Sequence, residues 1–363
     1  MSTIARASLR DFRNYERAEL HLAPGLTVIS GPNGAGKTNL LEALYFGLTG
    51  RSCRTSNERE VVRVGGSVAR VEIEVEADDG RHLLEVGFEP GEDKRMRVDG
   101  AALDRAGALP GRPLVSVFLP DRLDLVKGAP AGRRGHLDQV VAALWPARAD
   151  ARVAYSRALS QRNALVARVR AGAARAELLD PWDAELARHG AQLMEHRSAA
   201  VEAIAPAFAE RADELGLPDA PEVRYAPRSS GDLRAELLER RASDIERGFT
   251  QHGPHRDEVS LLHGGRALRT LGSQGQQRVA LLALLFAERD VLVRHERPPL
   301  MLLDDVMSEL DETRRRRLAE LVRAGGQAVI TTTEAEHVPG ADSGDVTVVE
   351  VRDGTLAPAV AAA

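Results

Sequence analysis

Cysteine is almost absent from this sequence: the 363 residues include one, Cys53. A single thiol cannot form an intrachain disulfide or supply a multi-thiolate metal site, and such usage is typical of the reducing cytoplasm, where we expect the protein to be. Long hydrophobic runs are absent too, since the longest, Val279 to Ala287, is far shorter than the ~20 residues that cross a bilayer. Charged residues begin at Arg6, Arg10 and Asp11. We therefore expect no transmembrane helix, no secretory signal and no membrane partner.

An excess of basic charge is also lacking. The chain has 49 basic and 54 acidic side chains, which gives a net charge of −5. The charge of the whole chain therefore does not indicate a nucleic-acid binder, and any such surface must be a local patch. Lysine is scarce, with only Lys37, Lys94 and Lys127, so each needs a specific reason. The hydrophobic content of 43% is enough for a buried core in one large or two small domains.

The pattern of residues changes twice along the chain. Alternation at Ser67 to Glu76 and at His82 to Glu89 predicts antiparallel strands in the first third. From about Arg133 to Arg241, helical spacing predicts an inserted arm with two helices of ~25 to 35 residues, although an ordinary helical subdomain explains the same pattern. Strands and helices then alternate again. We predict one α/β domain in two halves, residues 1–125 and 246–363, interrupted by an arm at 126–245.

The last part of the chain gives the sharpest element predictions. A long helix is predicted at 275–293, a strand at 300–303, a helix at 311–322 and a strand at 328–331. Glycine pairs and Asp-Gly dipeptides predict hairpins at 264–265 and at 353–354.

A glycine-rich loop follows the apolar strand Leu26 to Ser30 and precedes an apolar helical run, Leu40 to Leu48. It has the form GxxxxGK[ST], in the strand–loop–helix context of a phosphate-binding loop. Glycines let backbone N–H groups turn toward phosphate oxygens, and the helix N-terminus adds positive potential. The compact ammonium of Lys37 fits between two phosphates, and the hydroxyl of Thr38 can ligate magnesium. We expect a nucleotide to be held by Gly31, Pro32, Asn33, Gly34, Ala35, Gly36, Lys37, Thr38 and Asn39.

Two acidic residues follow the hydrophobic strand at 300–303. Nucleotide-bound magnesium needs a carboxylate at such a position, so Asp304 is the predicted metal ligand. Asp305 is the predicted catalytic carboxylate that directs the attacking water, beside Lys37 on the phosphates. Taken alone, adjacent acids after a strand could equally cap a helix.

A second anion site is predicted where the long helix begins. Ser273, Gln274, Gly275 and Gln276 stand at this helix start, where a small polar residue and a glycine leave backbone N–H groups accessible to phosphate. Two such sites in one chain suggest a nucleotide held between two copies, with Asp311 reaching across the interface. The alternative is that Ser273 and Asp311 are helix caps.

The order of these motifs resembles an ABC-type ATPase head. The separation of 273 − 37 = 236 residues is too long for a transporter subunit, and the chain is too short for an SMC-type protein with hundreds of coiled-coil residues. The segments Pro120 to Asp138, Thr250 to Asp257 and Leu302 to Asp311 resemble the RecF family of bacterial DNA replication and repair proteins. The resemblance covers essentially the full chain and implies an ABC-type P-loop ATPase head with an antiparallel β subdomain and a helical arm.

The resemblance also implies a function. RecF-like proteins are cytoplasmic, bind ATP and Mg²⁺, and dimerise on ATP. They favour gapped DNA or junctions of single- and double-stranded DNA, and they act with RecO and RecR to place RecA on gaps. This implies roles in recombinational repair, in maintaining replication forks and in the SOS response to DNA damage, with ATP hydrolysis as a timer for residence on DNA.

Three departures from the family pattern affect these expectations. His136 stands where an aromatic residue is usual, no glutamine occurs at Pro120-Asp121, and a threonine run, 331–333, replaces the histidine that many of these ATPases use to sense the γ-phosphate. The last two suggest weak hydrolysis, and we expect DNA to stimulate it. The competing hypotheses are a transporter energy-coupling subunit and a nucleotide-gated scaffold with negligible turnover.

Candidate DNA contacts come from arginine clusters. Arg51 and Arg54 follow the phosphate-loop helix, and Arg133 and Arg134 open the arm. Each pair could equally belong to a solvated or salt-bridged helix face. The segment Phe12 to Tyr15 is expected near either the nucleotide base or DNA, and the sequence does not decide between them.

Overall fold

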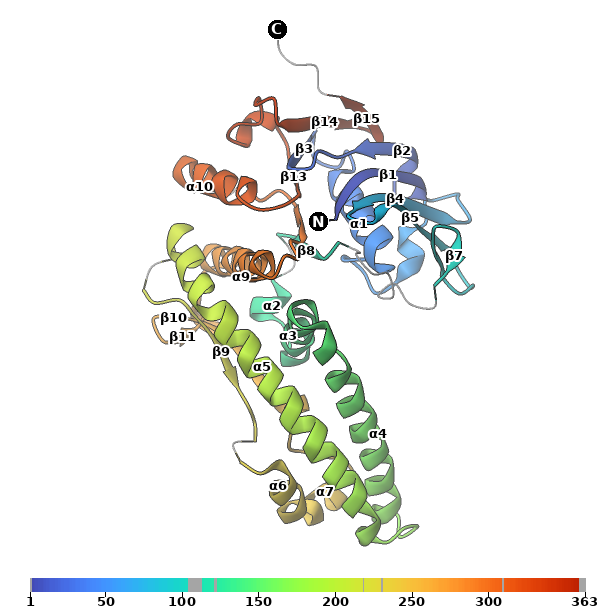
Figure 1. Ribbon diagram of the computed structural model, residues 1–363, viewed down its shortest axis with the longest axis vertical. Coiled ribbons are helices and arrows are strands. Elements are labelled where there is room, and N and C mark those ends of the chain that lie inside the picture. The colour runs from blue at the N-terminus through green and yellow to red at the C-terminus, as the bar shows by residue number, and fades with distance from the viewer. Residues whose placement is uncertain are drawn as a thin grey trace. The chain divides into compact units, whose positions relative to one another are not determined.

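The computed structural model describes residues 2–103, 113–120, 123–217, 219–229, 231–308 and 310–358. The chain divides into two compact units (Figure 1). The first unit combines Met1–Arg122 with Leu292–Ala363, and the second is Leu123–Val291. The two ends of the chain therefore build one unit, which the middle of the chain interrupts.

An antiparallel sheet forms one layer of the first unit. Its strand order is β2-β1-β4-β5-β6-β7, and every neighbouring pair is antiparallel. In β4, Val71, Ile73 and Val75 are buried and alternate with more exposed charged residues, because successive side chains of a strand point to opposite faces. The strands are β1 Thr3–Phe12, β2 Tyr15–His21, β4 Ala69–Ala77, β5 Gly80–Phe88, β6 Arg95–Val98 and β7 Ala101–Ala102.

A second, mainly parallel sheet has the order β15-β14-β3-β13-β12-β8, in which only the β14–β15 hairpin is antiparallel. Every residue of β3, β12 and β13 is buried, as expected for strands covered on both faces. Helix α1 (Lys37–Thr49) contributes Leu40, Leu41 and Phe46 to the core shared by the two sheets. The other elements are β3 Leu26–Ser30, β8 Val115–Phe118, β12 Leu300–Leu303, α10 Glu312–Arg323, β13 Ala328–Thr332, β14 Val346–Arg352 and β15 Thr355–Pro358.

Long helices dominate the second unit. Helices α4 (Asp150–Arg170) and α5 (Asp180–Glu214) pack side by side, and the 35 residues of α5 span about 50 Å at 1.5 Å per residue (Figure 1). A small antiparallel sheet of order β11-β10-β9 lies in the same unit. The remaining elements are α2 Asp124–Lys127, α3 Pro130–Leu144, β9 Glu222–Ala226, α6 Leu233–Glu239, α7 Arg241–Arg247, β10 Glu258–His263, β11 Arg266–Ala267, α8 Leu268–Leu271 and α9 Gln274–Arg294. Short 3₁₀ helices are η1 Glu58–Val61, η2 Pro146–Arg148, η3 Ala176–Leu179, η4 Pro254–Arg256 and η5 Ala335–His337.

The predicted fold class is confirmed, with an α/β head, an antiparallel subdomain and an inserted helical segment. The predicted strands at 300–303 and 328–331 match β12 and β13, and the hairpins at 264–265 and 353–354 are present. Strand β9 lies inside the segment predicted to be helical. Residues 246–291 belong to the second unit, whereas the predicted boundary puts them in the head, because β10 pairs with β9. Within the described ranges, no helix combines the length and hydrophobicity needed to span a membrane.

Candidate nucleotide-binding site

The glycine-rich loop turns sharply between β3 and α1. Gly31, Gly34 and Gly36 have φ values of 151°, 81° and 115°, which residues with a Cβ atom rarely adopt. A Cβ on Gly31 would lie 2.2 Å from the Val351 carbonyl oxygen, and one on Gly36 would meet the side chains of Asn14 and Tyr15. Gly31 is therefore required by a close backbone approach and Gly36 by packed side chains, in addition to φ, whereas Gly34 is required by φ alone. The loop backbone has the form that the sequence predicts for an anion cradle at a helix N-terminus.

Lys37, the first residue of α1, lies along the loop. Its side chain is buried, and its Nζ donates hydrogen bonds to the carbonyl oxygens of Gly31 at 2.7 Å and Pro32 at 3.0 Å. Burial lowers the pKa of Lys37, and the nearby carboxylates of Asp305 and Asp304 oppose that shift. The ammonium is thus held at the loop, next to the acid pair.

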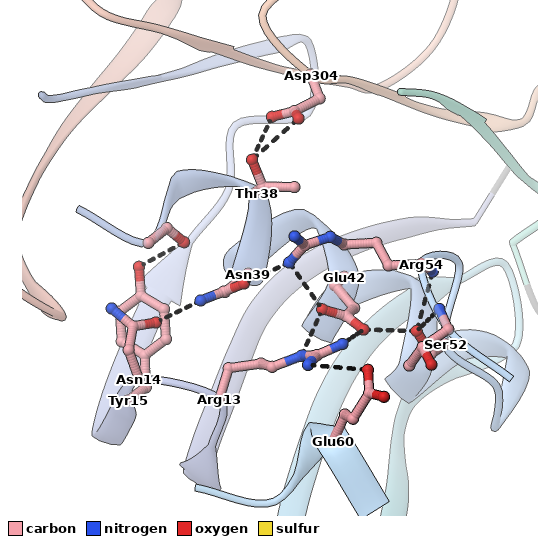
Figure 2. Close-up of polar contacts among 12 residues, drawn as sticks. Arg13, Asn14, Tyr15, Thr38, Asn39, Glu42, Ser52, Arg54, Glu60 and Asp304 are labelled. Carbon is pink, nitrogen blue, oxygen red and sulfur yellow. Dashed lines mark hydrogen bonds and ion pairs between the residues drawn. The ribbon is translucent and has the colours of Figure 1, made fainter. Parts of the chain in front are cut away.

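Thr38 and Asp304 are 266 positions apart in sequence and meet at the carboxyl edge of the parallel sheet (Figure 2). The Thr38 hydroxyl lies 3.0 and 2.9 Å from the two carboxylate oxygens of Asp304. Thr331, at the end of β13, donates a hydrogen bond of 2.6 Å to Asp304 and accepts one of 2.9 Å from the Asp305 N–H. Burial raises the pKa of Asp304, and the hydrogen bonds from Thr331 and Thr38 act against the rise.

Asp305 has two unusual features. Its φ is 44°, and its Oδ1 is buried with no hydrogen-bond partner among the described residues. A buried carboxylate oxygen without a partner is costly and indicates that the group serves a ligand or a water. The carboxylate also acts on the pKa of Lys37, so both groups face the same site.

The oxygen donors fit magnesium. Mg²⁺ prefers hydroxyl, carboxylate and water oxygens, and it is held by few protein ligands in nucleotide sites. The Thr38 hydroxyl and the Asp304 carboxylate are adjacent and would hold the ion, as the sequence predicts.

The turn between β1 and β2 packs on the phosphate loop. Asn14 Nδ2 donates to the Ala35 carbonyl oxygen at 3.1 Å. The Tyr15 hydroxyl donates to the Gly36 carbonyl oxygen at 3.0 Å (Figure 2). Asn39 Nδ2 donates to Asn14 Oδ1 at 2.7 Å. Of the two predicted surroundings for this turn, the structure therefore favours the nucleotide site. Nothing in the local sequence specified these contacts, because they join residues far apart in the chain.

In the second unit, Ser273 caps the N-terminus of α9. Its Oγ accepts a hydrogen bond from the Gln276 N–H at 3.2 Å, and Gln276 Oε1 accepts one from the Ser273 N–H at 2.8 Å. This reciprocal pair is a capping box. Ser273, Gln274 and Gly275 are exposed. Ser273 is therefore a helix cap, as the alternative prediction states, and its exposure is also compatible with a role at an interface.

Asp311, in the first unit, caps α10 by accepting a 2.9 Å hydrogen bond from the Arg314 N–H. It too is exposed, so its predicted role across an interface stays a prediction. Two positions of the predicted motifs, Asp121 and Glu309, lie outside the described residues.

The four arginines proposed for DNA differ in their surroundings. Arg133 is 5% exposed, and its Nε donates to the Val259 carbonyl oxygen at 2.6 Å and to Glu258 at 3.1 Å. Its burial among these acceptors leaves it unable to bind DNA in this structure, which corrects that expectation. Arg134 is half-buried and donates to the Asp257 carbonyl oxygen at 2.7 Å. Arg51 and Arg54 are exposed, although Arg54 also contacts Asn39.

His136 and Thr331 stand at two of the positions where the sequence departs from the family pattern. His136 Nε2 lies 2.7 Å from Glu288 Oε1, an ion pair between α3 and α9. Burial alone would lower the pKa of His136, but the Glu288 carboxylate outweighs it and raises the pKa. Near the end of β13, Thr331 hydrogen-bonds to both Asp304 and Asp305, so this one residue of the threonine run holds the acid pair in place.

Comparisons with known proteins agree on one family. A family model described as an AAA domain matches residues 6–116. The chain is 37% identical to "DNA replication and repair protein RecF" of Streptomyces avermitilis, with 97% of this chain and 99% of the relative covered. It is 38% identical to the protein of the same name from an Anaeromyxobacter species, over 97% and 98% of the two chains.

Solved structures give the same result. A structure named as the recombination mediator protein RecF with ATP, in the RecFOR pathway, matches with a TM-score of 0.85 and 28% identity, covering 99% of this chain and 98% of that one. The Smc head domain of Pyrococcus furiosus matches with a TM-score of 0.60 and 19% identity, over 98% and 95% of the chains, and therefore shares the fold alone.

Proposed function

Because the chain belongs to the RecF family of DNA replication and repair proteins, we propose that it is a magnesium-dependent ATPase that binds DNA as an ATP-bound dimer. The observation that carries the proposal is the convergence of Lys37, Thr38 and Asp304 at the phosphate loop. A family relative of similar fold is described as a complex with ATP, which supports the same ligand here. Family membership also removes the hypothesis of a transporter subunit.

The side chains divide the work of hydrolysis. The loop N–H groups and Lys37 would bind the phosphates, and Thr38 and Asp304 would hold the metal ion. Magnesium bound there would neutralise charge on the phosphate oxygens. Asp305, whose buried Oδ1 has no hydrogen-bond partner in the described part of the chain, orients the attacking water. Thr331 fixes the acid pair by hydrogen bonding to both residues. Catalysis then depends mainly on positioning and electrostatics.

The DNA-related part of the proposal goes further. We propose that the ATP-bound dimer binds single-strand gaps and junctions of single- and double-stranded DNA, and that it acts with RecO and RecR to load RecA. The similar structure is described as RecF with ATP in the RecFOR pathway, which supports these partners. Weak, DNA-stimulated hydrolysis would reset the dimer. A scaffold with negligible turnover is the second candidate, favoured by the threonines that replace the sensor histidine.

Replacing Asp305 with asparagine should slow hydrolysis by roughly 100-fold, as expected when a positioned carboxylate is lost. Binding of Mg²⁺-ATP should persist because Thr38 and Asp304 are unchanged. The measurements are phosphate release and the affinity for a fluorescent ATP analogue. Asp93→Asn, at an exposed position of the same unit, is the matched control. Loss of ATP binding in Asp305→Asn would instead require the roles of Asp304 and Asp305 to be exchanged.

Affinity for gapped DNA should rise with ATP and fall steeply with salt. A plot of log affinity against log salt concentration should have a slope of about −0.7 to −0.9 for each phosphate neutralised. Exposed Arg51 should contribute, so Arg51→Gln should lower the magnitude of the slope by about 1. The same DNA should accelerate ATP hydrolysis. Fluorescence anisotropy and phosphate release test both expectations, and equal DNA binding with ADP and ATP would refute a nucleotide-gated dimer. If DNA accelerates ATP turnover without accelerating ATP binding, this result would count against the scaffold with negligible turnover.

A further inference from the structure

A fully buried carboxylate lies behind the phosphate loop and has no part in the proposed chemistry. Glu42 is on α1, one turn after Thr38, and its side chain is 0% exposed. Its carboxylate accepts two hydrogen bonds from Arg13, 2.8 Å from Nε and 2.6 Å from Nη2, and one from the Ser52 hydroxyl at 2.5 Å. Arg54 Nη1 lies at 3.4 Å (Figure 2). A buried acid with this many donors joins the turn between β1 and β2 to the segment after α1.

Arg13 needs such an anchor. Its φ of 53° lies in the left-handed region, which is unfavourable for an L-residue with a side chain. The bidentate ion pair with Glu42 holds the guanidinium in one orientation and so keeps the strained turn in place. Glu60, the other acidic contact of Arg13, is 3.9 Å away and half exposed, so solvent weakens it.

The anchored turn in turn contacts the loop that binds phosphate. Asn14 and Tyr15 follow Arg13 directly and donate to the carbonyl oxygens of Ala35 and Gly36. Burial raises the pKa of Tyr15, so its hydroxyl stays protonated and remains a donor. These carbonyls share their peptide groups with the N–H groups of Gly36 and Lys37, so holding the carbonyls also fixes the directions of those two N–H groups.

We propose that Glu42 is a positioning residue for nucleotide binding, which acts through Arg13 and the β1–β2 turn to set the conformation of the phosphate loop. The proposal rests on the ATP binding proposed above. It requires that Glu42 never touch the nucleotide, and its complete burial agrees with that. Glutamine has the same size but replaces one carboxylate oxygen with an NH₂ donor, so it cannot accept from both nitrogens of Arg13 in the bidentate geometry.

Glu42→Gln should lower the affinity for a fluorescent ATP analogue by roughly tenfold to 100-fold, the range expected for loss of charged hydrogen bonds. The KM for ATP should rise while kcat at saturating ATP stays within about twofold, since Asp304 and Asp305 are untouched. Glu60→Gln, which removes the exposed contact of the same arginine, is the matched control and should retain wild-type affinity. A folded Glu42→Gln protein with wild-type affinity for ATP would overturn the proposal.

If Glu42→Gln does not fold, Tyr15→Phe still tests the proposal, because it removes only the hydroxyl that contacts Gly36. It should lower ATP affinity by about two- to tenfold; wild-type affinity would overturn the proposal. In the double variant the two losses should not add, because both act through the same turn, and additive losses would count against it. Failure of the wild-type protein to bind ATP would defeat the proposed function itself, whereas wild-type binding with unaffected variants would defeat only this inference.

Discussion

Replacing Lys37 with arginine should lower the affinity for ATP by roughly 100-fold, which corresponds to about 2.7 kcal/mol. The ammonium of Lys37 sits in a buried space against the carbonyl oxygens of Gly31 and Pro32. A guanidinium is larger and planar, so it cannot occupy the same position without moving the loop backbone. The positive charge is retained, and the loss therefore reports geometry and not charge. Binding of a fluorescent ATP analogue and phosphate release are the measurements.

The same replacement at Lys127 is the control, because this lysine is exposed on α2 in the second unit. Lys127→Arg should bind and hydrolyse ATP like the wild-type protein. Thermal unfolding without nucleotide should be similar for both variants and the wild type. Wild-type affinity together with wild-type hydrolysis in Lys37→Arg would remove the phosphate loop from the proposed mechanism.

The phosphate loop and the strand before the acid pair could be predicted from sequence because their signals are local. The glycines of the loop mark positions with positive φ, and the apolar run at 300–303 coincides with the bounds of β12. The meeting of Thr38 with Asp304 was also predictable, since both residues follow parallel strands whose carboxyl ends share one edge.

Other features depend on partners far along the chain and left no local signal. Strand β9 forms in a helical context because it pairs with β10, more than 30 residues later. Arg133 looks like a surface arginine in sequence, but its acceptors, Glu258 and the Val259 carbonyl group, come from β10. Glu42 reads as an ordinary polar residue of α1, and only the fold brings Arg13 to it. Long-range pairs of this kind escape rules based on spacing.

Replacing Ser273 with arginine should abolish ATP-induced dimerisation while ATP binding to the monomer persists. In the proposed dimer, Ser273 and the start of α9 contact the γ-phosphate bound by the other copy, and a large cation there would block closure. The phosphate loop of the same chain is unchanged. Light scattering with and without ATP is the measurement, and Ser156→Arg, at an exposed position of α4, is the matched control.

The capping box makes a second comparison necessary, because Ser273→Arg also removes the Oγ acceptor of the Gln276 N–H, a loss worth about 1 kcal/mol. A mixture of Ser273→Arg with Lys37→Arg tests whether each nucleotide site is shared between two chains. One site of the heterodimer then combines the intact phosphate loop of the first chain with the intact serine of the second. Light scattering should show partial recovery of ATP-induced dimers, which a nucleotide site formed within a single chain would not produce. If Ser273→Arg dimerises normally with ATP, then Ser273 acts only as a helix cap and the nucleotide is not shared between two copies.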